Sequence, residues 1–490
     1  MDMKTSPLGA LAEPSLLKTE ALLGGDWTGG DDRFPVIDPA TGRELARVPN
    51  LDAAAAEAAL AAAAAAWPAW RERSAKERAA VLMRWYALVQ QHAEALARIM
   101  TAEQGKPLAE ARGEIAYAAS FVEWFAEEAK RVYGDAIPSP AADKRIFVIK
   151  QPIGVCAMIT PWNFPAAMIT RKAAPALAAG CTVVVKPAEQ SPLTAVRLAE
   201  LWVSAGGPAE VFQVLPASDP AAVSRVFFDD PAIRKLSFTG STEIGVLLGG
   251  QAVRTMKRVS LELGGHAPFL IFADADLDAA VKDVFASKFR NAGQTCVCAN
   301  RIYVHADVHD RFVERFAAAA AGLRVGDPLD ETTQIGPLVD AQGLAKVRAH
   351  VDDALSKGAR AVLGGTSGEG LTFNPTVLTS VSRGMRILEE ETFGPVAPIV
   401  PFTEESDAIR HANDTPFGLA AYLWTRDLSR AFRVAEALDY GIVGVNDGLP
   451  STAQAPFGGM KMSGVGREGG LWGIEEYLDV KYMSIGIQGV

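Results

Sequence analysis

The sequence predicts an α/β protein in which parallel sheets are covered by helices. From residue 153 onward, short apolar runs alternate with stretches that are compatible with helices. The length of 490 residues corresponds to about three folded units at roughly 150 residues each. The composition, 49% hydrophobic and 22% charged, is typical of a globular protein. Strands that alternate with helices form βαβ units with right-handed crossovers.

The charge and the apolar stretches exclude several classes of protein. The chain has 48 basic and 58 acidic residues, a net charge of −10, whereas a nucleic-acid-binding surface needs a basic field. The alanine-rich run at 58–66 is shorter than the ~20 residues of a membrane span, and the N-terminus lacks the apolar core of a secretory signal. Four cysteines are too few for a disulfide framework. We therefore expect a cytoplasmic protein without nucleic-acid or membrane partners.

The first third of the chain is predicted to be helical. Residues 52–100 are rich in Ala, Glu and Arg, with apolar residues at helical spacing, and Asp52 is the expected N-cap. The Gly105-Lys106-Pro107 sequence interrupts this pattern, and a second helix should follow to about Val132. The alternation at 145–150 predicts a strand.

Two sets of strands are predicted after this helical region. The first sheet should contain the runs 153–160, 182–186, 211–215, 235–239 and 259–263. Two glycines then lead into a new region, where the run 267–272 and further strands over 280–445 continue the alternation and form a second α/β domain. The C-terminal stretch EEYLDVKYMSIGIQ has no obvious pairing partner nearby in the sequence. It is expected to be either an edge strand or a strand lent to another subunit.

Two glycine-containing segments are candidates for phosphate binding. Residues 464–469 match G-x-G-x-x-G, but that fingerprint must open a βαβ unit, and only 21 residues follow Gly469. We therefore predict a tight turn there. Gly240 and Ser241 are the better candidates, because they follow a predicted strand and begin a helix whose free N–H groups suit an anion. A Ser N-cap without a ligand is the alternative.

Lys186 and Glu189 are candidates for binding a ribose. Lys186 ends a predicted strand directly before a proline, and open α/β sheets bind ligands at the carboxyl ends of their strands. The two side chains can donate to and accept from sugar hydroxyl groups. A solvated pair of opposite charges is the alternative.

Three residues are candidates for chemistry at a carbonyl group. Cys296 lies in a polar segment, and a nucleophilic thiolate needs a lowered pKa, which a helix N-terminus can supply. Glu262 is a carboxylate inside an apolar strand, where burial raises the pKa and suits a general base. Asn163 directly follows a strand and can donate to an oxyanion. The alternatives are a packed cysteine, an ion-paired acid and a turn asparagine. The absence of a Cys/His cluster predicts no metal.

Taken together, the motifs resemble the NAD(P)-dependent aldehyde dehydrogenase superfamily over essentially the whole chain. Seven segments occur in that family's order: TPWNFP, VVVKPAEQSP, SFTGSTEIG, LELGG, GQTCVCANR, EETFGPVAP and PFGGMKMSGVGRE. The segments AMITRKAAPALAAGC and KFRNAGQTCVCANR and the KYMSIG ending are most similar to the succinate-semialdehyde dehydrogenase branch. The resemblance implies oxidation of an aldehyde to a carboxylic acid through a thioester on cysteine.

The resemblance also implies a role for each candidate. Cys296 would be the nucleophile, Glu262 the general base, and Asn163 with the backbone N–H of Cys296 the oxyanion hole. The cofactor-binding residues it implies are Trp162, Lys186, Glu189, Gly240, Ser241, Glu391 and Phe393. A structural protein on the same fold is a distant alternative, and the joint presence of the three catalytic candidates argues against it.

The substrate implied by this branch is a small aldehyde with a terminal carboxylate. Its anchors would be Arg171, Arg290 and Ser451, since a guanidinium can hold a carboxylate bidentately. Ion pairing within the fold is the alternative for both arginines. Pro450 precedes Ser451 where the branch tends to have an aliphatic residue. Glutarate semialdehyde and a broader specificity therefore compete with succinate semialdehyde.

Two further expectations concern the cofactor and oxidation. Glu189 would accept from the 2′-hydroxyl of NAD and repel the 2′-phosphate of NADP, so NAD is favoured over NADP. Cys298 is a possible redox partner of Cys296, and a bridge between such close cysteines would be strained and labile. A small packed residue is the alternative for Cys298.

The resemblance implies an aldehyde-dehydrogenase-like fold with three parts. Residues 1–129 and 152–263 would form a Rossmann-type cofactor-binding domain, and 264–445 an α/β catalytic domain. Residues 130–151 and 474–490 would form a small β extension for oligomerisation, which implies a homodimer or homotetramer. The return segment 446–473 would contact both the substrate and the cofactor-binding domain.

Overall fold

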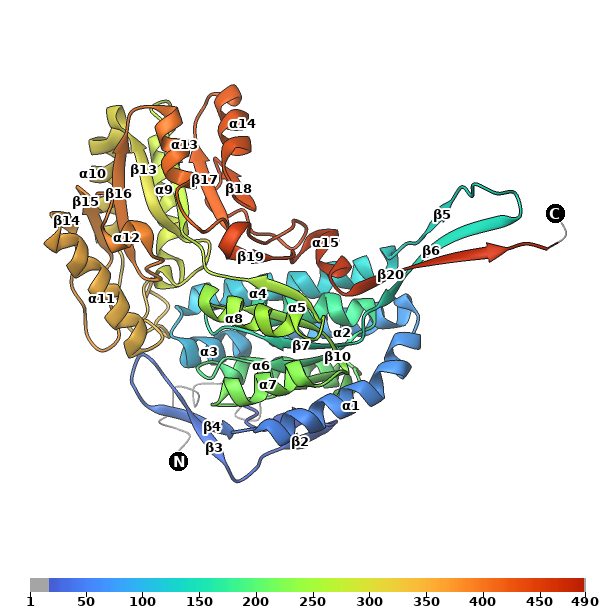
Figure 1. Cartoon of the computed structure of the whole chain (residues 1–490). Coiled ribbons are helices and arrows are strands. Elements are labelled where there is room, and N and C mark those ends of the chain that lie inside the picture. The colour runs from blue at the N-terminus through green and yellow to red at the C-terminus, as the bar shows by residue number, and fades with distance from the viewer. Residues whose placement is uncertain (1–16, 489–490) are drawn as a thin grey trace.

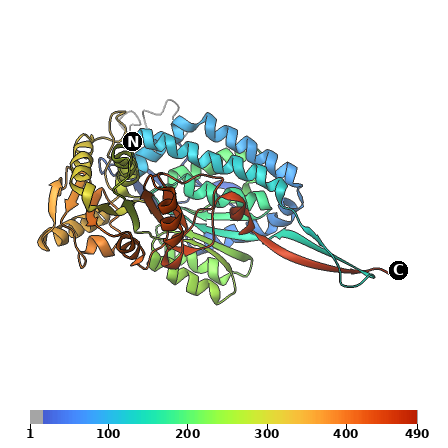
Figure 2. The same cartoon turned by 90° about the horizontal axis from the view of Figure 1, so that it is seen from above.

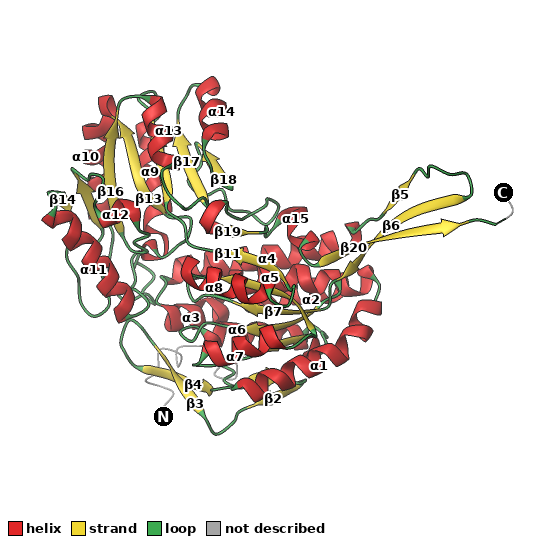
Figure 3. Cartoon of the chain, viewed as in Figure 1, coloured by secondary structure: helices red, strands yellow, loops and turns green. Residues whose placement is uncertain are grey.

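Two large sheets and one projecting arm organise the chain, as Figures 1 and 3 show. The computed structural model describes residues 17–488. The first sheet has the strand order β19 (Gly464–Val465), β11 (Arg258–Glu262), β10 (Ile233–Thr239), β7 (Val155–Ile159), β8 (Thr182–Lys186), β9 (Phe212–Val214), β1 (Ala21–Leu23) and β2 (Asp26–Thr28). The strands from β11 to β9 are parallel, so their carboxyl ends share one edge. The five predicted strands of this sheet are confirmed.

Helices cover both faces of the first sheet, as the view from above shows (Figure 2). One face is covered by α1 (Ala53–Glu72), α7 (Pro220–Asp229) and α8 (Thr242–Val253). The other is covered by α2 (Ala75–Gln91), α3 (Ala93–Gln104), α4 (Leu108–Glu128), α5 (Ala167–Ala179) and α6 (Pro192–Ser204). Asp52 caps α1 as predicted, and Ser74 separates α1 from α2 because it forms a capping box with Glu77. Strand β8 is completely buried, which explains its unbroken apolar run.

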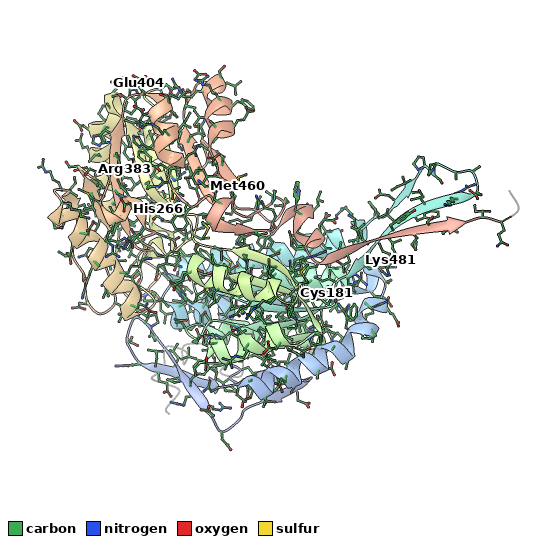
Figure 4. All side chains as sticks on the ribbon, in the orientation of Figure 1. Cys181, His266, Arg383, Glu404, Met460 and Lys481 are labelled. Carbon is green, nitrogen blue, oxygen red and sulfur yellow. The ribbon has the colours of Figure 1, made fainter. Side chains whose placement is uncertain are left out.

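The second sheet has seven strands. Their order is β14 (Arg360–Leu363), β15 (Thr376–Thr379), β16 (Val396–Phe402), β13 (Ala299–His305), β12 (Ala267–Ile271), β17 (Ala420–Trp424) and β18 (Ile442–Val445). One face packs on α9 (Leu277–Phe289), α10 (His309–Ala321) and α11 (Ala341–Ser356), and the other on α13 (Glu405–Asn413) and α14 (Leu428–Ala437). The short helix α12 (Arg386–Glu389) precedes β16. We call the first sheet with its helices the first lobe, and the second sheet with its helices the second lobe. Figure 4 labels His266, which lies just before β12 near the junction of the two lobes.

A three-stranded sheet forms the arm that projects from the first lobe (Figure 1). The last strand β20 (Leu478–Gly486) pairs along its whole length with β6 (Lys144–Pro152), which also pairs with β5 (Asp135–Ile137). Lys481 marks β20 in Figure 4. The final strand is therefore an edge strand of its own chain, one of the two predicted alternatives. The role of this arm in oligomerisation stays a prediction.

The remaining strands form the hairpin of β3 (Arg33–Ile37) and β4 (Glu44–Pro49), and the remaining α-helix is the short α15 (Gly470–Glu475). Between residues 17 and 488, none of the helices combines the length and apolar character needed to cross a bilayer.

Candidate active site

The loops that follow β7 and β10 line a cavity of about 350 Å³. Parallel strands of one sheet end at the same edge, which is why residues far apart in sequence meet here. Seven of the predicted site residues line it: Trp162, Asn163, Gly240, Ser241, Cys296, Glu391 and Phe393. A second cavity of about 700 Å³ shares Trp162, Gly240 and Ser241 with the first and extends to Lys186 and Glu189 between α7 and α8. Together they form one elongated cleft.

The helix α8 begins in the middle of this cleft. The Ser241 side chain caps the helix by accepting from the N–H of Ile244 at 3.3 Å. Gly240 has no room for a side chain, because a Cβ there would lie 2.4 Å from the ring of Phe238. The capping that we considered as the alternative is thus present, and the same residues also line the cleft, where the first N–H groups of α8 favour an anion.

At the far end of the cleft, Lys186 and Glu189 form an ion pair. Lys186 ends β8 and is buried, which lowers its pKa, whereas the side chain of Glu189 is 32% exposed. The pair is therefore a charged group at the cleft wall that can contact sugar hydroxyls.

Cys296 lines the first of the two cavities. It follows the turn Arg290–Gly293, whose last three residues have positive φ, and is half-buried. Burial raises the pKa of the Cys296 thiol to about 12, although Arg171 acts in the opposite direction. We expected a lowered pKa from a helix N-terminus, and the structure corrects this, because no helix begins at Cys296. The thiol therefore needs a base before it can react.

The side-chain amide of Asn163 uses one of its two hydrogens within the protein, which leaves the other available to a ligand. Its side-chain Nδ2 donates to the carbonyl oxygen of Gln294 at 3.0 Å, and a side-chain amide has two hydrogens. Its main-chain oxygen accepts from Lys106 Nζ at 2.9 Å and from Asn291 Nδ2 at 3.0 Å. The loop that carries Asn163 is thus held on both sides.

Glu262 is the last residue of β11 and is 3% exposed. Neither carboxylate oxygen has a hydrogen-bond partner among the protein's described residues. Burial and the neighbouring charge of Glu468 raise the pKa of Glu262 well above its usual value, while Arg171 and Lys172 act against this. The ion-paired structural acid that we considered as the alternative for Glu262 is therefore not what the structure shows.

Glu391 and Phe393 border the cavity from the second lobe. The Glu391 carboxylate accepts from the N–H of Gly265 at 3.2 Å, and burial raises its pKa to about 7. The ring of Phe393 meets that of Trp162 edge to face, with 5.6 Å between the ring centres. Gly265 also approaches Cys296, since a Cβ at 265 would lie 2.4 Å from the Cys296 carbonyl oxygen.

The two predicted anchor arginines have different surroundings. Arg171 is 2% exposed, forms an ion pair with Glu468, and stacks 3.9 Å above the ring of Phe457. The expected alternative, ion pairing within the fold, thus holds for Arg171. Arg290 forms no ion pair within residues 17–488 and lies 5.1 Å from the centre of the Phe164 ring. Its charge is close enough to lower the pKa of Cys296.

Five predicted residues line neither cavity: Glu262, Arg171, Arg290, Ser451 and Cys298. Ser451 is half-buried in the loop after β18, and it is not part of either cavity wall. Cys298 is completely buried, with its Sγ 3.5 Å from the carbonyl oxygen of Lys288. Both Cys296 and Cys298 are free thiols, so a disulfide between them stays a prediction.

Several residues of the cleft were not predicted. Asp340, Gln342 and Lys346 reach the cavity from the start of α11. Their segment matches none of the motifs above, so local sequence offers no signal for them. No group of three or more His, Cys, Asp or Glu residues in the described part of the chain could hold a metal ion.

Comparison with known proteins assigns the family. The sequence model described as the aldehyde dehydrogenase family matches residues 27–483. The chain belongs to this family. Succinate-semialdehyde dehydrogenase (NADP(+)) GabD of Escherichia coli K12 is 57% identical, over 97% of this chain and 100% of the relative. Two enzymes of Pseudomonas putida are each 55% identical: a 3-sulfolactaldehyde dehydrogenase (97% of this chain, 99% of the relative) and, from strain KT2440, a glutarate-semialdehyde dehydrogenase (97% and 100%).

A solved structure supports the same assignment. The crystal structure of an Escherichia coli NADP-dependent enzyme has a TM-score of 0.96 at 57% identity, and the match covers 97% of this chain and all of that one. The expected fold, the expected enzyme class and the resemblance to semialdehyde dehydrogenases are therefore confirmed. The family uses NAD(P), and the preference for NAD stays a prediction, because the Escherichia coli relatives are named for NADP.

Proposed function

We propose that this aldehyde dehydrogenase oxidises succinate semialdehyde to succinate, with NAD as the preferred cofactor. The observation that carries the proposal is one cationic side chain, Arg290, which has no ion-pair partner within residues 17–488 and whose charge lowers the pKa of the nucleophile candidate Cys296. A carboxylate at the far end of a short aldehyde can occupy that position. The names of the relatives agree, since two of them act on aldehydes with a terminal carboxylate.

The cleft fits a nicotinamide dinucleotide. It is elongated, has a helix N-terminus at its middle for phosphates, and has a polar pair at one end for a ribose. Ser241 and the first N–H groups of α8 would hold the phosphates, Lys186 and Glu189 the adenosine ribose, and Glu391 and Phe393 the other ribose. When bound, the dinucleotide supplies the acceptor for a hydride from the aldehyde carbon.

The protein's own residues perform the acyl chemistry. Glu262 takes the proton of Cys296, and the sulfur adds to the aldehyde carbon. The second hydrogen of the Asn163 amide stabilises the oxyanion that forms. Loss of the hydride leaves a thioester on Cys296. Glu262 passes the thiol proton to solvent and is ionised again. It then deprotonates a water molecule, which hydrolyses the thioester, regenerates the Cys296 thiol and releases the carboxylic acid.

The carboxylate anchor is assigned to Arg290 before Arg171. Arg171 already forms an ion pair with Glu468, so its guanidinium is engaged within the fold, whereas Arg290 has no ion-pair partner among the described residues. Arg171 would shape the substrate site through the ring of Phe457. Ser451, in the loop after β18, lines neither cavity, so the anchor role is not extended to it. Glutarate semialdehyde is the second candidate substrate, favoured by the relative that carries its name.

The cofactor preference rests on Glu189. Its carboxylate would repel the 2′-phosphate of NADP, while its ion pair with Lys186 occupies a cation that could offset this repulsion. Because the charges of Lys186 and Glu189 compensate each other, the pair should bind the neutral 2′-hydroxyl of NAD better than the 2′-phosphate of NADP.

A panel of specificity constants tests the proposed function. The ratio kcat/KM is measured for succinate semialdehyde, glutarate semialdehyde and the uncharged aldehyde butanal, each with NAD and with NADP. We expect succinate semialdehyde with NAD to have the highest value, and the Cys296→Ser enzyme to be inactive. A higher value for glutarate semialdehyde or butanal would overturn the proposed substrate, and full activity of Cys296→Ser would overturn the chemistry.

A further inference from the structure

Three consecutive residues just before the nucleophile have a left-handed backbone. Asn291 has φ 51° and ψ 38°, Ala292 has φ 53° and ψ 33°, and Gly293 has φ 76°. L-residues adopt this conformation unfavourably, because their Cβ approaches the following carbonyl oxygen, whereas glycine has no Cβ. At Gly293 a Cβ would also lie 2.1 Å from the Gly394 carbonyl oxygen. Such a turn persists only where its surroundings hold it.

Groups from the first lobe hold this left-handed turn (291–293). The backbone N–H of Asn291 donates to Glu110 Oε2 at 2.6 Å. The side-chain oxygen of Asn291 accepts from Gln104 Nε2 at 3.1 Å, and its Nδ2 donates to the main-chain oxygen of Asn163 at 3.0 Å. Asn291 itself is 1% exposed, so water does not replace these partners.

The turn is connected directly to the reacting groups. The main-chain oxygen of Asn291 accepts from the side chain of Gln294 at 3.0 Å. The carbonyl oxygen of Gln294 in turn accepts from Asn163 Nδ2 at 3.0 Å, and Gln294 lies two residues before Cys296. A shift of the turn therefore moves the sulfur and rotates the amide at the same time.

Glu110 is the one charged group among the partners of Asn291. It lies in the first turn of α4, and burial raises its pKa to about 7 in spite of the nearby charges of Lys106 and Arg290. A carboxylate that accepts from a backbone N–H makes a stronger hydrogen bond than a neutral acceptor. The proposed chemistry gives Glu110 no part, so its partly buried position calls for another role.

We propose that Glu110 is a positioning residue: its hydrogen bond to the Asn291 N–H holds the left-handed turn and thereby places Cys296 and Asn163 for reaction. This inference rests on the proposed function for the roles of Cys296 and Asn163. It links the two lobes, since Glu110 belongs to the first and Asn291 to the segment that enters the second.

The test compares Glu110→Leu with Arg112→Leu. Arg112 lies on the same helix and loses two surface ion pairs, with Glu94 and Glu331, but contacts no part of the site. For Glu110→Leu we expect kcat to fall roughly 10- to 100-fold, because small misplacements of reacting groups are costly, while KM changes much less. Glu110→Gln keeps an acceptor oxygen and should retain most of the activity. Arg112→Leu should keep wild-type kcat.

A second substitution separates positioning from loss of folding. Glycine adopts the left-handed conformation without penalty, so Ala292→Gly in the Glu110→Leu background should restore kcat several-fold. If Glu110→Leu does not fold, Glu110→Ala replaces it in both comparisons. A kcat unchanged by loss of the Glu110 carboxylate, or no recovery on adding Ala292→Gly, would overturn the proposal.

The outcome is independent of which aldehyde is the true substrate. The expected loss of kcat is the same factor for succinate semialdehyde and for butanal, because the displaced groups act on every aldehyde. A loss confined to the charged aldehyde would contradict positioning and would point to substrate binding instead. Failure of the specificity panel alone would leave the Glu110 result standing.

Discussion

Replacing Arg290 by methionine should separate charged from uncharged aldehydes. Methionine keeps a long apolar side chain against Phe164 but removes the only cation that we assign to the substrate carboxylate. A hydrogen bond to a charged group contributes about 1.5–3 kcal/mol net. At 1.36 kcal/mol for each factor of ten, kcat/KM for succinate semialdehyde should fall roughly 10- to 150-fold, mostly through a higher KM.

Butanal serves as the internal reference for this experiment. Arg290 also lowers the pKa of Cys296, so its loss slows every aldehyde to some degree. That part cancels when kcat/KM for succinate semialdehyde is divided by kcat/KM for butanal. Arg315→Met, which removes a surface ion pair with Asp278, is the control for loss of one positive charge. Equal losses for both aldehydes in Arg290→Met would refute the assignment of the anchor.

Two more predictions concern the cofactor and the base. Glu189→Ser removes the repelling carboxylate and frees Lys186, so the ratio of kcat/KM for NADP to that for NAD should rise on the order of tenfold; an unchanged ratio would count against the role of Glu189. Because the pKa of Glu262 is raised and a base works only when ionised, wild-type kcat should increase with pH through a pKa well above the usual carboxylate value. Glu262→Gln should remove this increase of kcat with pH and lower kcat by about 10²- to 10⁴-fold. A near-normal kcat would exclude Glu262 as the base.

Local sequence patterns were sufficient for the parts of the fold that depend on neighbours along the chain. The parallel strands are recognisable because burial on both faces makes them uniformly apolar, as at 182–186. The cleft residues that follow those strands are then predictable, since parallel strands end at one edge. Asn163, Lys186 and Ser241 were found in this way.

Contacts between distant segments could not be predicted in the same way. The ion pair between Arg171 and Glu468 depends on tertiary packing, and so does the pKa of Cys296, which the burial of the thiol raises. The hydrogen bond from Asn291 to Glu110 joins residues on different lobes, and nothing in either segment marks the pairing. Long-range geometry of this kind decides how a predicted residue is used.

The position of Glu468 has a consequence for synthesis of the chain. Its carboxylate pairs with both Arg171 and Lys172, two buried cations of the first lobe, although it belongs to the C-terminal segment. Strand β19 beside it also completes an edge of the first sheet. A nascent chain still tethered to the ribosome short of residue 468 leaves both cations uncompensated in an apolar interior. The first lobe is translated first, but it can complete its folding only after the C-terminal segment has been synthesised.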